Sequence, residues 1–393
     1  MKRLSLLSFI VFGLLMTALS YSQKVTPQLS GSKCYFQVAN VYFEVYPAYG
    51  GRISSLKLDN KEIMYIDSVG GNYLWGSTFW QSPQSDWNWP PSTSLDQLAY
   101  SGGIYGDSVN ILSKVDDTWS TNLRFRKTFY ADLSDTSVTI KYFMINTGSS
   151  ACVNAPWEIT RVPVGGMEFF PDTGSTTGPL AAQTSKIGQL RWLNYTGSSS
   201  GLKCFGNSLE NWTAWINSDS AVFIKKFSNV PSGTEAPGES EIEYYYSGPG
   251  SYYELENQGE YSSIIAKDSL KWVMKWYVRK LPKSVDATKG SVDLANFVRT
   301  VVGIPKHIDA IKDSYVKNNI NISPNPAREL IKISGLNEPA NIILTDISGR
   351  IVLTATIRNS QNTILVNSLA EGFYLYNIYS SNARYSGKLI IKR

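Results

Sequence analysis

Short segments of alternating apolar and polar side chains follow one another from residue 41 to residue 278. In 41–46, for example, valine and phenylalanine alternate with tyrosine and glutamate, and the turn-forming pairs Gly50-Gly51 and Asp59-Asn60 separate the segments that follow. Alternation with a period of two is typical of β-strands that bury one face. No 12-residue segment before residue 290 has the periodicity of an amphipathic helix. The pattern therefore predicts a large all-β domain, built as an antiparallel sandwich or barrel.

Tryptophan is distributed unevenly, and its distribution indicates a domain boundary. All eleven tryptophans lie between Trp75 and Trp276, and none follows. Two regions of such different composition are expected to be two domains. We place the first domain at 24–285, a linker at 286–318 and the second domain at 319–393. Apolar residues recur at helical spacing from Val292 to Val302, which predicts one short helix within the linker.

The N-terminus has the composition of a secretory signal peptide, which we place at residues 1–22. Lys2 and Arg3 precede the apolar run Leu4–Leu19, and Ser20–Ser22 supplies the small residues of a cleavage site. The apolar run has about 16 residues, whereas a membrane-spanning helix needs about 20. We expect an exported protein without a membrane span. Its three cysteines allow at most one disulfide, so free thiols are expected.

Charge is also distributed unevenly along the chain. Residues 319–393 carry eight basic and four acidic side chains, and residues 23–318 carry 27 basic and 28 acidic side chains. The larger region is nearly neutral, which predicts no basic surface for phosphates and no nucleic-acid partner. The single histidine, His307, excludes a centre with several histidine ligands. We expect no metal site and no cofactor.

The loop from Trp80 to Pro91 has the composition of a carbohydrate-binding site. Trp80, Trp87 and Trp89 lie in this loop together with Gln84 and three prolines. The apolar face of a pyranose ring stacks on tryptophan, and amide groups bind its hydroxyls. The alternative is that these rings form an aromatic plug over one end of the sandwich.

A second candidate group consists of acidic and basic residues on strands. Glu254 and Glu256 are two residues apart, so their side chains point to the same face of a strand. Like charges this close would raise the pKa of one carboxyl group, which could then act as a general acid, so Glu254 is a catalytic candidate as well. Glu158 and Arg161 belong to another expected strand. The hypothesis is that Glu158 and Glu256 face each other across a sugar as acid and base, with Arg52 or Arg161 holding its hydroxyls or a uronate carboxylate.

That hypothesis has a purely structural alternative. Glu254 and Glu256 would then belong to an exposed strand face, with Lys271 and Lys275 opposite them.

The last 75 residues resemble the C-terminal sorting domain of the type IX (Por) secretion system of Bacteroidetes. The resemblance rests on Ile322–Pro326, Thr345–Arg350, Leu369–Tyr374 and Gly387–Arg393, in this order. It implies a small Ig-like β-sandwich, passage through the periplasm, recognition by the type IX translocon, and a secreted or cell-surface location. An Ig-like catalytic or binding module is the alternative.

The larger region resembles the galactose mutarotase-like (aldose epimerase-like) superfamily, in an uncharacterised secreted branch. The matching segments are Tyr49–Glu62, Trp80–Pro91, Pro156–Arg161, Glu254–Gly259 and Trp272–Leu281. The resemblance implies a large antiparallel β-sandwich with a sugar cleft on its concave face.

In that superfamily a glutamate base and a histidine acid carry out epimerisation. Here Leu98–Gly103 and Pro156–Glu158, where histidines are expected, contain none, and His307 lies in the expected linker. We therefore predict a secreted carbohydrate-binding protein that acts in glycan recognition or processing. One alternative is an epimerase, hydrolase or lyase that uses Glu158 and Glu256. The other is a cell-surface adhesion or structural protein without a small ligand.

Overall fold

The computed structural model describes residues 23–67, 72–87, 89–119, 121–174, 176–305, 320–336, 339–346, 350–358, 362–379 and 384–393. The chain divides into two compact units, residues 1–306 and 307–393. The predicted signal peptide, His307 and the second half of the predicted linker lie outside the described residues, as do residues 347–349 of the sorting-domain motif.

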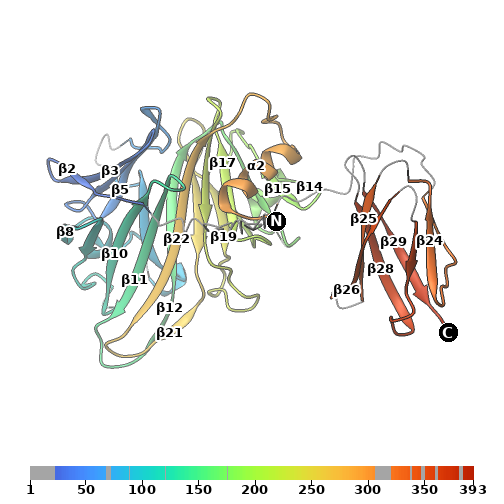
Figure 1. Ribbon diagram of the computed structural model, residues 1–393. Helices are drawn as coiled ribbons and strands as arrows, with labels where there is room; N and C mark the ends of the chain where they lie inside the picture. The colour runs from blue at the N-terminus through green and yellow to red at the C-terminus, as the bar shows by residue number, and fades with distance from the viewer. Residues whose placement is uncertain are drawn as a thin grey trace, which may run out of the picture. The chain divides into compact units, whose positions relative to one another are not determined.

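The larger unit contains two antiparallel sheets of eleven strands each, which we call sheet A and sheet B (Figure 1). In spatial order, sheet A consists of β14 (Ser185–Ile187), β15 (Leu190–Leu193), β13 (Met167–Pro171), β17 (Trp212–Ile216), β18 (Ala221–Lys226), β22 (Ser269–Lys280), β11 (Ser137–Asn146), β10 (Leu123–Asp132), β9 (Ser108–Leu112) and β8 (Ser101–Tyr105), with β1 (Lys24–Val25) beside β10. Sheet B consists of β16 (Leu202–Gly206), β19 (Ile242–Tyr246), β20 (Tyr252–Gln258), β12 (Cys152–Pro163), β7 (Ser77–Ser82), β5 (Arg52–Leu58), β4 (Val41–Tyr46), β3 (Lys33–Val38) and β2 (Gln28–Ser30), with β21 (Ser262–Ile264) beside β12 and β6 (Lys61–Glu62) beside β5.

The core of this unit lies between the two sheets, because alternate side chains of each strand point toward the other sheet. Phe79 on β7 stacks on Tyr142 on β11 with ring centroids 4.2 Å apart, and Phe43 on β4 meets Trp276 on β22 at 6.0 Å. These contacts join sheet B to sheet A. The predicted large antiparallel sandwich is confirmed.

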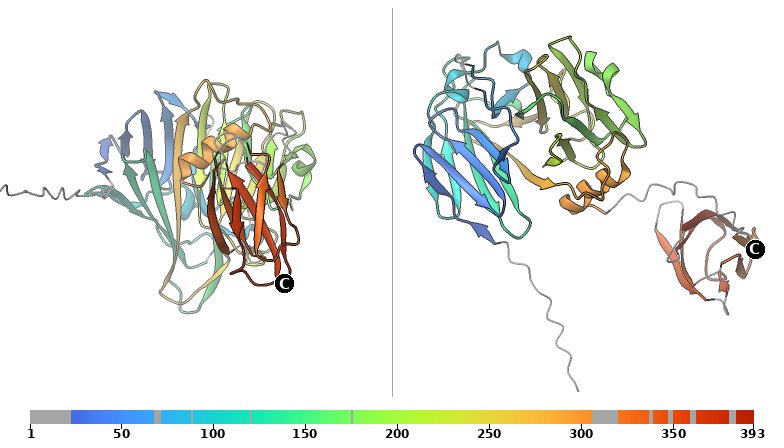
Figure 2. Two further views of the ribbon diagram at one scale, coloured as in Figure 1. Left: turned by 45° about the vertical axis from the view of Figure 1, so that its right-hand side comes forward. Right: turned by 90° about the horizontal axis from the view of Figure 1, so that it is seen from above.

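The first half of the predicted linker is part of the larger unit. It contains the expected helix, α2 (Val292–Val302), which begins after an N-cap at Ser291 and ends at Gly303 in the left-handed conformation. Leu294 and Val298 are fully buried in one cluster with Val222 and Ile224 of sheet A. The helix lies against the outer face of this sheet (Figures 1 and 2). The helix therefore belongs to the sandwich, because its apolar face covers an apolar part of the sheet.

The smaller unit is a two-sheet sandwich with its own core (Figure 2). One sheet consists of β23 (Asn321–Ser323), β24 (Leu330–Ser334) and β27 (Thr363–Leu365), and the other of β26 (Ile351–Ile357), β25 (Ala340–Thr345), β28 (Gly372–Tyr379) and β29 (Arg384–Ile391). Ile331 and Ile333 from the first sheet share this core with Ile342 and Leu389 from the second. The prediction of a small β-sandwich after the large one is confirmed.

Three short helical segments complete the described elements: η2 (Gln84–Asp86), α1 (Thr93–Asp96) and η3 (Pro179–Gln183). No helix in the described ranges is both long and apolar enough to cross a bilayer. Cys34, Cys152 and Cys204 are all free thiols.

Candidate functional site

The outer face of sheet B, which is turned away from sheet A, carries most of the predicted site residues. Leu255 on β20 and Val162 on β12 belong to the core, so their sequence neighbours point outward. The register places Arg161 opposite Glu254, and Ile159 opposite Glu256. Folding thus brings Glu254, Glu256 and Arg161 together on one face.

Arg161 lies at the centre of this face and is fully buried. Its Nη2 is 2.8 Å from Glu254 Oε1, and its Nη1 donates to Thr78 Oγ1 at 3.3 Å. The guanidinium carbon lies 5.6 Å from the ring centroid of Trp80 and 5.7 Å from that of Tyr252. Burial raises the pKa of Glu254 to about 7, although Arg161 opposes the shift.

A second charged cluster adjoins the first and contains two residues that sequence analysis missed, Lys203 on β16 and Glu243 on β19. Glu243 and Glu256 are directly opposite each other on neighbouring strands. Lys203 Nζ lies 2.5 Å from Glu243 Oε2 and 3.0 Å from Glu256 Oε2, and Trp157 Nε1 donates to Glu256 Oε2 at 2.8 Å. Burial of Lys203 acts to lower its pKa, but the two neighbouring carboxylates outweigh this effect and raise it. Burial also raises the pKa of Glu243. Lys203 therefore neutralises two like charges that would otherwise repel each other.

Arg52 has a structural role at the edge of this face. Its Nη2 is 3.2 Å from Asp96 Oδ2, and its Nη1 donates to the carbonyl oxygens of Tyr73 and of Trp75, the latter at 2.8 Å. Asp96 Oδ1 accepts a hydrogen bond from Trp80 Nε1 at 2.8 Å. With its side chain fully buried, Arg52 joins β5 to α1 and to the segment before β7. Through Asp96, Arg52 helps to fix the position of the Trp80 ring.

The tryptophan loop divides into a buried part and an exposed part. Trp80 and Trp87 are buried with ring centroids 6.0 Å apart, and Trp87 Nε1 donates to the carbonyl oxygen of Gln81 at 3.1 Å. Trp89 remains 49% exposed, and its ring centroid lies 5.8 Å from that of Trp80 and 6.3 Å from that of Tyr73. The plug alternative therefore describes Trp80 and Trp87, and only Trp89 offers an open ring face.

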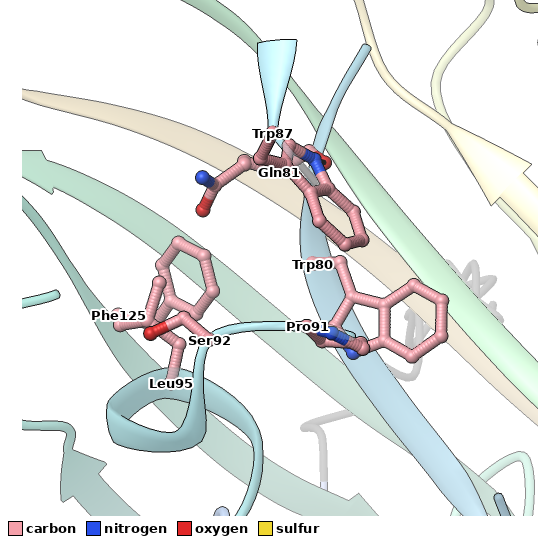
Figure 3. A pocket seen from close by; sticks show the side chains of 7 residues that line it. All are labelled: Trp80, Gln81, Trp87, Pro91, Ser92, Leu95 and Phe125. Carbon is pink, nitrogen blue, oxygen red and sulfur yellow. Dashed lines mark hydrogen bonds between the residues drawn. The ribbon is translucent and has the colours of Figure 1, made fainter. Parts of the chain in front are cut away.

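Two further observations concern the surroundings of this loop. Figure 3 shows a small cavity between the rings of Trp80, Trp87 and Phe125, and its volume of about 10 Å³ has room for about one water. Gln84 is half-buried on η2, where its backbone N–H donates to Glu239 Oε1 at 3.1 Å. A sugar ring does not fit into this cavity, so a ligand would bind on the open side of the loop.

Glu158 does not belong to this site. Its side chain is fully buried between the sheets, where Oε2 is 2.5 Å from Lys225 Nζ on β18 of sheet A. Oε1 accepts hydrogen bonds from Ser77 Oγ and Thr160 Oγ1, both at 2.6 Å. Glu158 and Glu256 therefore do not face each other, because the register pairs Glu256 with Ile159 and places Glu158 on the opposite face of β12. This geometric expectation is wrong.

The predicted structural alternative for the glutamates is wrong as well. Lys271 and Lys275 lie on β22 of sheet A, opposite Phe143 and Thr139. They are on a different sheet from Glu254 and Glu256.

In the described part of the chain, no group of three histidine, cysteine, aspartate or glutamate side chains is placed to hold a metal ion.

The fold defines a two-sheet β-sandwich protein with a second, smaller β-sandwich unit after the first. Residues 321–392 match the family described as the secretion system C-terminal sorting domain, which confirms this part of the sequence prediction. The domain marks the protein for type IX secretion, to the outside or to the cell surface. No curated protein sequence matches the chain.

Several solved structures are similar to part of this chain, and they include mutarotase-like proteins. A galactose mutarotase-like protein from Clostridium acetobutylicum is 10% identical, with a TM-score of 0.45 over 66% of this chain and 99% of the other. A second one, from Lactobacillus casei, is 12% identical, with a TM-score of 0.45 over 62% and 99%.

A TPR-domain containing protein from Parabacteroides distasonis is 13% identical, with a TM-score of 0.47 over 65% of this chain. This chain spans 48% of that protein, about half its length.

Proposed function

We propose that the larger unit binds carbohydrate on the outer face of sheet B, and that the exported protein serves in glycan recognition. The observation that supports this most directly is the gathering of charged groups and aromatic rings on one face. Lys203 is the partly exposed end of the charged clusters, the side chain of Glu254 is 11% exposed, and Trp89 and Tyr245 supply partly exposed rings. Carboxylates and ammonium groups bind sugar hydroxyls, and aromatic rings stack on the apolar face of a pyranose.

The rigidity of the surroundings favours binding as well. Glu254 is held by Arg161, and Glu256 by Lys203 and Trp157, so both carboxylates have a fixed position before any ligand arrives. A site that is already ordered loses little conformational entropy on binding.

The test is a glycan array with the full chain, followed by titration of each neutral glycan that binds. The variant is Trp89→Ala, and the matched control is Tyr105→Ala, since Tyr105 is a 62% exposed ring on β8 of sheet A. We expect Trp89→Ala to weaken binding by about tenfold, the usual scale for one stacked ring, and Tyr105→Ala to leave it unchanged. Absence of any neutral glycan ligand would instead support the adhesion or structural alternative.

A second candidate function is acid–base catalysis on the bound sugar, now with Glu254 and Glu256. Glu254 has a pKa of about 7, which suits a group that donates a proton near neutral pH, and Glu256 is paired with Lys203. Polarimetric anomerisation and reducing-end release test this function. Activity that is present in the parent, lost in Glu254→Gln and retained in Tyr105→Ala would select the enzyme, and unchanged turnover in Glu254→Gln would exclude this assignment.

A further inference from the structure

The outer face of sheet A is strongly basic where β10, β11 and β22 lie side by side (Figure 1). The side chains that point away from the core on these strands include six cations and no acidic residue except Asp132 at the end of β10. The cations are Arg124, Arg126, Lys141, Lys271, Lys275 and Arg279. We call this group the basic face.

Acidic side chains near the basic face lie at its two ends. At one end, Glu260 lines a pocket together with Lys271. At the other end, Asp135 lies in the turn between β10 and β11 and pairs with Lys275, and Asp132 is 3.5 Å from Lys24. Neither of these two ion pairs includes Arg126, Lys141 or Lys271, which lie further along the strands. The near-neutral charge sum of residues 23–318 thus conceals a face of one sign.

Aromatic rings alternate with the cations on this face. The register forms a row of Arg126, Phe143 and Lys271 across three strands, and the guanidinium carbon of Arg126 lies 3.9 Å from the ring centroid of Phe143. Lys141 lies diagonally across from Tyr130 on the neighbouring strand, and its Nζ is 4.6 Å from the ring centroid of Tyr130. Phe143 and Lys141 are half-buried, and Arg126 and Lys271 are exposed, so all four are open to a ligand.

We propose that the basic face binds an acidic polysaccharide, that is, a glycan with repeated carboxylate or sulfate groups. Rows of cations spaced along a sheet complement a polymer with repeated negative charges, and release of its counterions favours binding. The rings between the cations hold Arg126 and Lys141 in place through cation–π contacts, so the positive charges keep a fixed spacing. The partner is a polysaccharide because the sorting domain sends this protein outside the cell or to its surface. The proposal is independent of carbohydrate binding on sheet B.

The test is a titration of the full chain with alginate, which carries carboxylates, and with heparin, which carries sulfates as well. Dextran serves as the neutral polymer and a 20-base-pair DNA duplex as the other polyanion. Each titration is run at low and at physiological salt. We expect alginate or heparin to bind, dextran not to bind at this face, and affinity to fall steeply with salt.

The variant reverses two exposed charges, Arg126→Glu with Lys271→Glu. The matched control reverses two exposed lysines at the far edge of the larger unit, Lys186→Glu on β14 with Lys289→Glu, and produces the same net charge. We expect the variant to lose about tenfold or more in affinity for the acidic polymer and to show a smaller salt dependence, and the control to change little. Circular dichroism and the melting temperature of both proteins should match those of the parent.

Three outcomes would overturn the proposal. The first is that neither alginate nor heparin binds. The second is that the control loses as much affinity as the variant, which would indicate a net-charge effect. The third is that the DNA duplex binds more tightly than both polysaccharides at the same salt, which would make the face a nucleic-acid surface. None of these results bears on the proposal for sheet B, which is tested separately by neutral-glycan binding of Trp89→Ala.

Discussion

Replacement of Lys203 by methionine is the sharpest test of how the charged site on sheet B is held together. Lys203 lies between Glu243 and Glu256, which are directly opposite each other on neighbouring strands, and its side chain is only 21% exposed. Removing one partner of a buried ion pair costs about 3–5 kcal/mol, because the remaining charge stays buried. Lys203 retains some exposure, so we expect a loss at the lower end, about 3 kcal/mol at pH 8.

The pH dependence of this loss follows from the carboxyl groups. Burial already raises the pKa of Glu243, and removing Lys203 raises it further. A buried carboxyl group with a raised pKa destabilises the folded state only when it is ionised. This free-energy cost is therefore absent at low pH and grows as pH rises through the folded-state pKa. The loss caused by Lys203→Met should therefore be smaller at pH 5 than at pH 8. Adding Glu243→Gln to Lys203→Met should restore part of the stability at pH 8.

Urea unfolding followed by tryptophan fluorescence measures this effect in the full chain. All eleven tryptophans lie between Trp75 and Trp276, so the signal reports the larger unit alone. The control is Lys186→Met, because Lys186 is 38% exposed and its Nζ is 3.8 Å from Asp172. Asp172 is buried but keeps Arg191 at 2.6 Å as its nearer partner, so loss of the exposed, more distant lysine should cost only about 0–1 kcal/mol. A loss below about 1 kcal/mol for Lys203→Met, or a loss that is larger at pH 5, would refute the reasoning.

Three further variants test other parts of the structure by the same unfolding measurement. Lys225→Met should cost about 3–5 kcal/mol at pH 8, since it leaves Glu158 unpaired between the sheets; a loss no greater than for an exposed lysine would contradict the pairing. Gly50→Ala should cost at least about 3 kcal/mol, because a Cβ there would lie 1.8 Å from the carbonyl oxygen of Asp96 at a positive φ, whereas Gly106→Ala, also at positive φ but in open space, should cost only about 1 kcal/mol. Glu254→Gln should become increasingly favourable relative to the parent between pH 4.5 and 7, by up to about 3 kcal/mol, because ionised Glu254 with its raised pKa destabilises the folded state; a pH-independent difference would show that its pKa is ordinary.

The sequence predicted the strands well because alternation is visible wherever one face of a sheet is apolar. It did not predict the face on which Glu158 lies, because nearly every residue of β12 is buried on both faces and the strand carries charged side chains in both directions. Neighbouring residues on a strand point to opposite sides, so an error of one position moves a side chain from the outer face into the core. For β20 the spacing of Glu254 and Glu256 was sufficient, since it places both on one face without stating which one.

The helix α2 shows the same limit at a larger scale. Its periodicity, its N-cap Ser291 and its terminal Gly303 are visible in the sequence. Its docking surface is not, because β18 contains the run Ala221–Ile224, whose residues are buried on both faces. A continuous apolar run does not reveal which side is covered by a helix and which by the other sheet. The helix therefore resembled a linker element, although its apolar face completes the sandwich.

Lys203 and the basic face were missed for a related reason. Both depend on the order of strands within a sheet, which brings Lys203 on β16 next to Glu256 on β20, and Arg126 on β10 into one row with Lys271 on β22. A charge sum along the chain cannot detect this, because it adds residues that the fold places on opposite sides of the molecule.

The two outer faces of the sandwich therefore differ in the kind of sugar that they suit. On sheet B, Lys203 and Arg161 are already engaged by carboxylates, so this face has little free positive charge for an acidic group. On sheet A, Arg126, Lys141 and Lys271 have no carboxylate among their salt bridges in the described residues. If both proposals hold, neutral sugars bind on sheet B with a weak dependence on salt, and acidic polymers bind on sheet A with a strong one. Because the two faces lie on opposite sides of one core, neutral oligosaccharide should not compete with alginate, and competition between them would show that they share a single site.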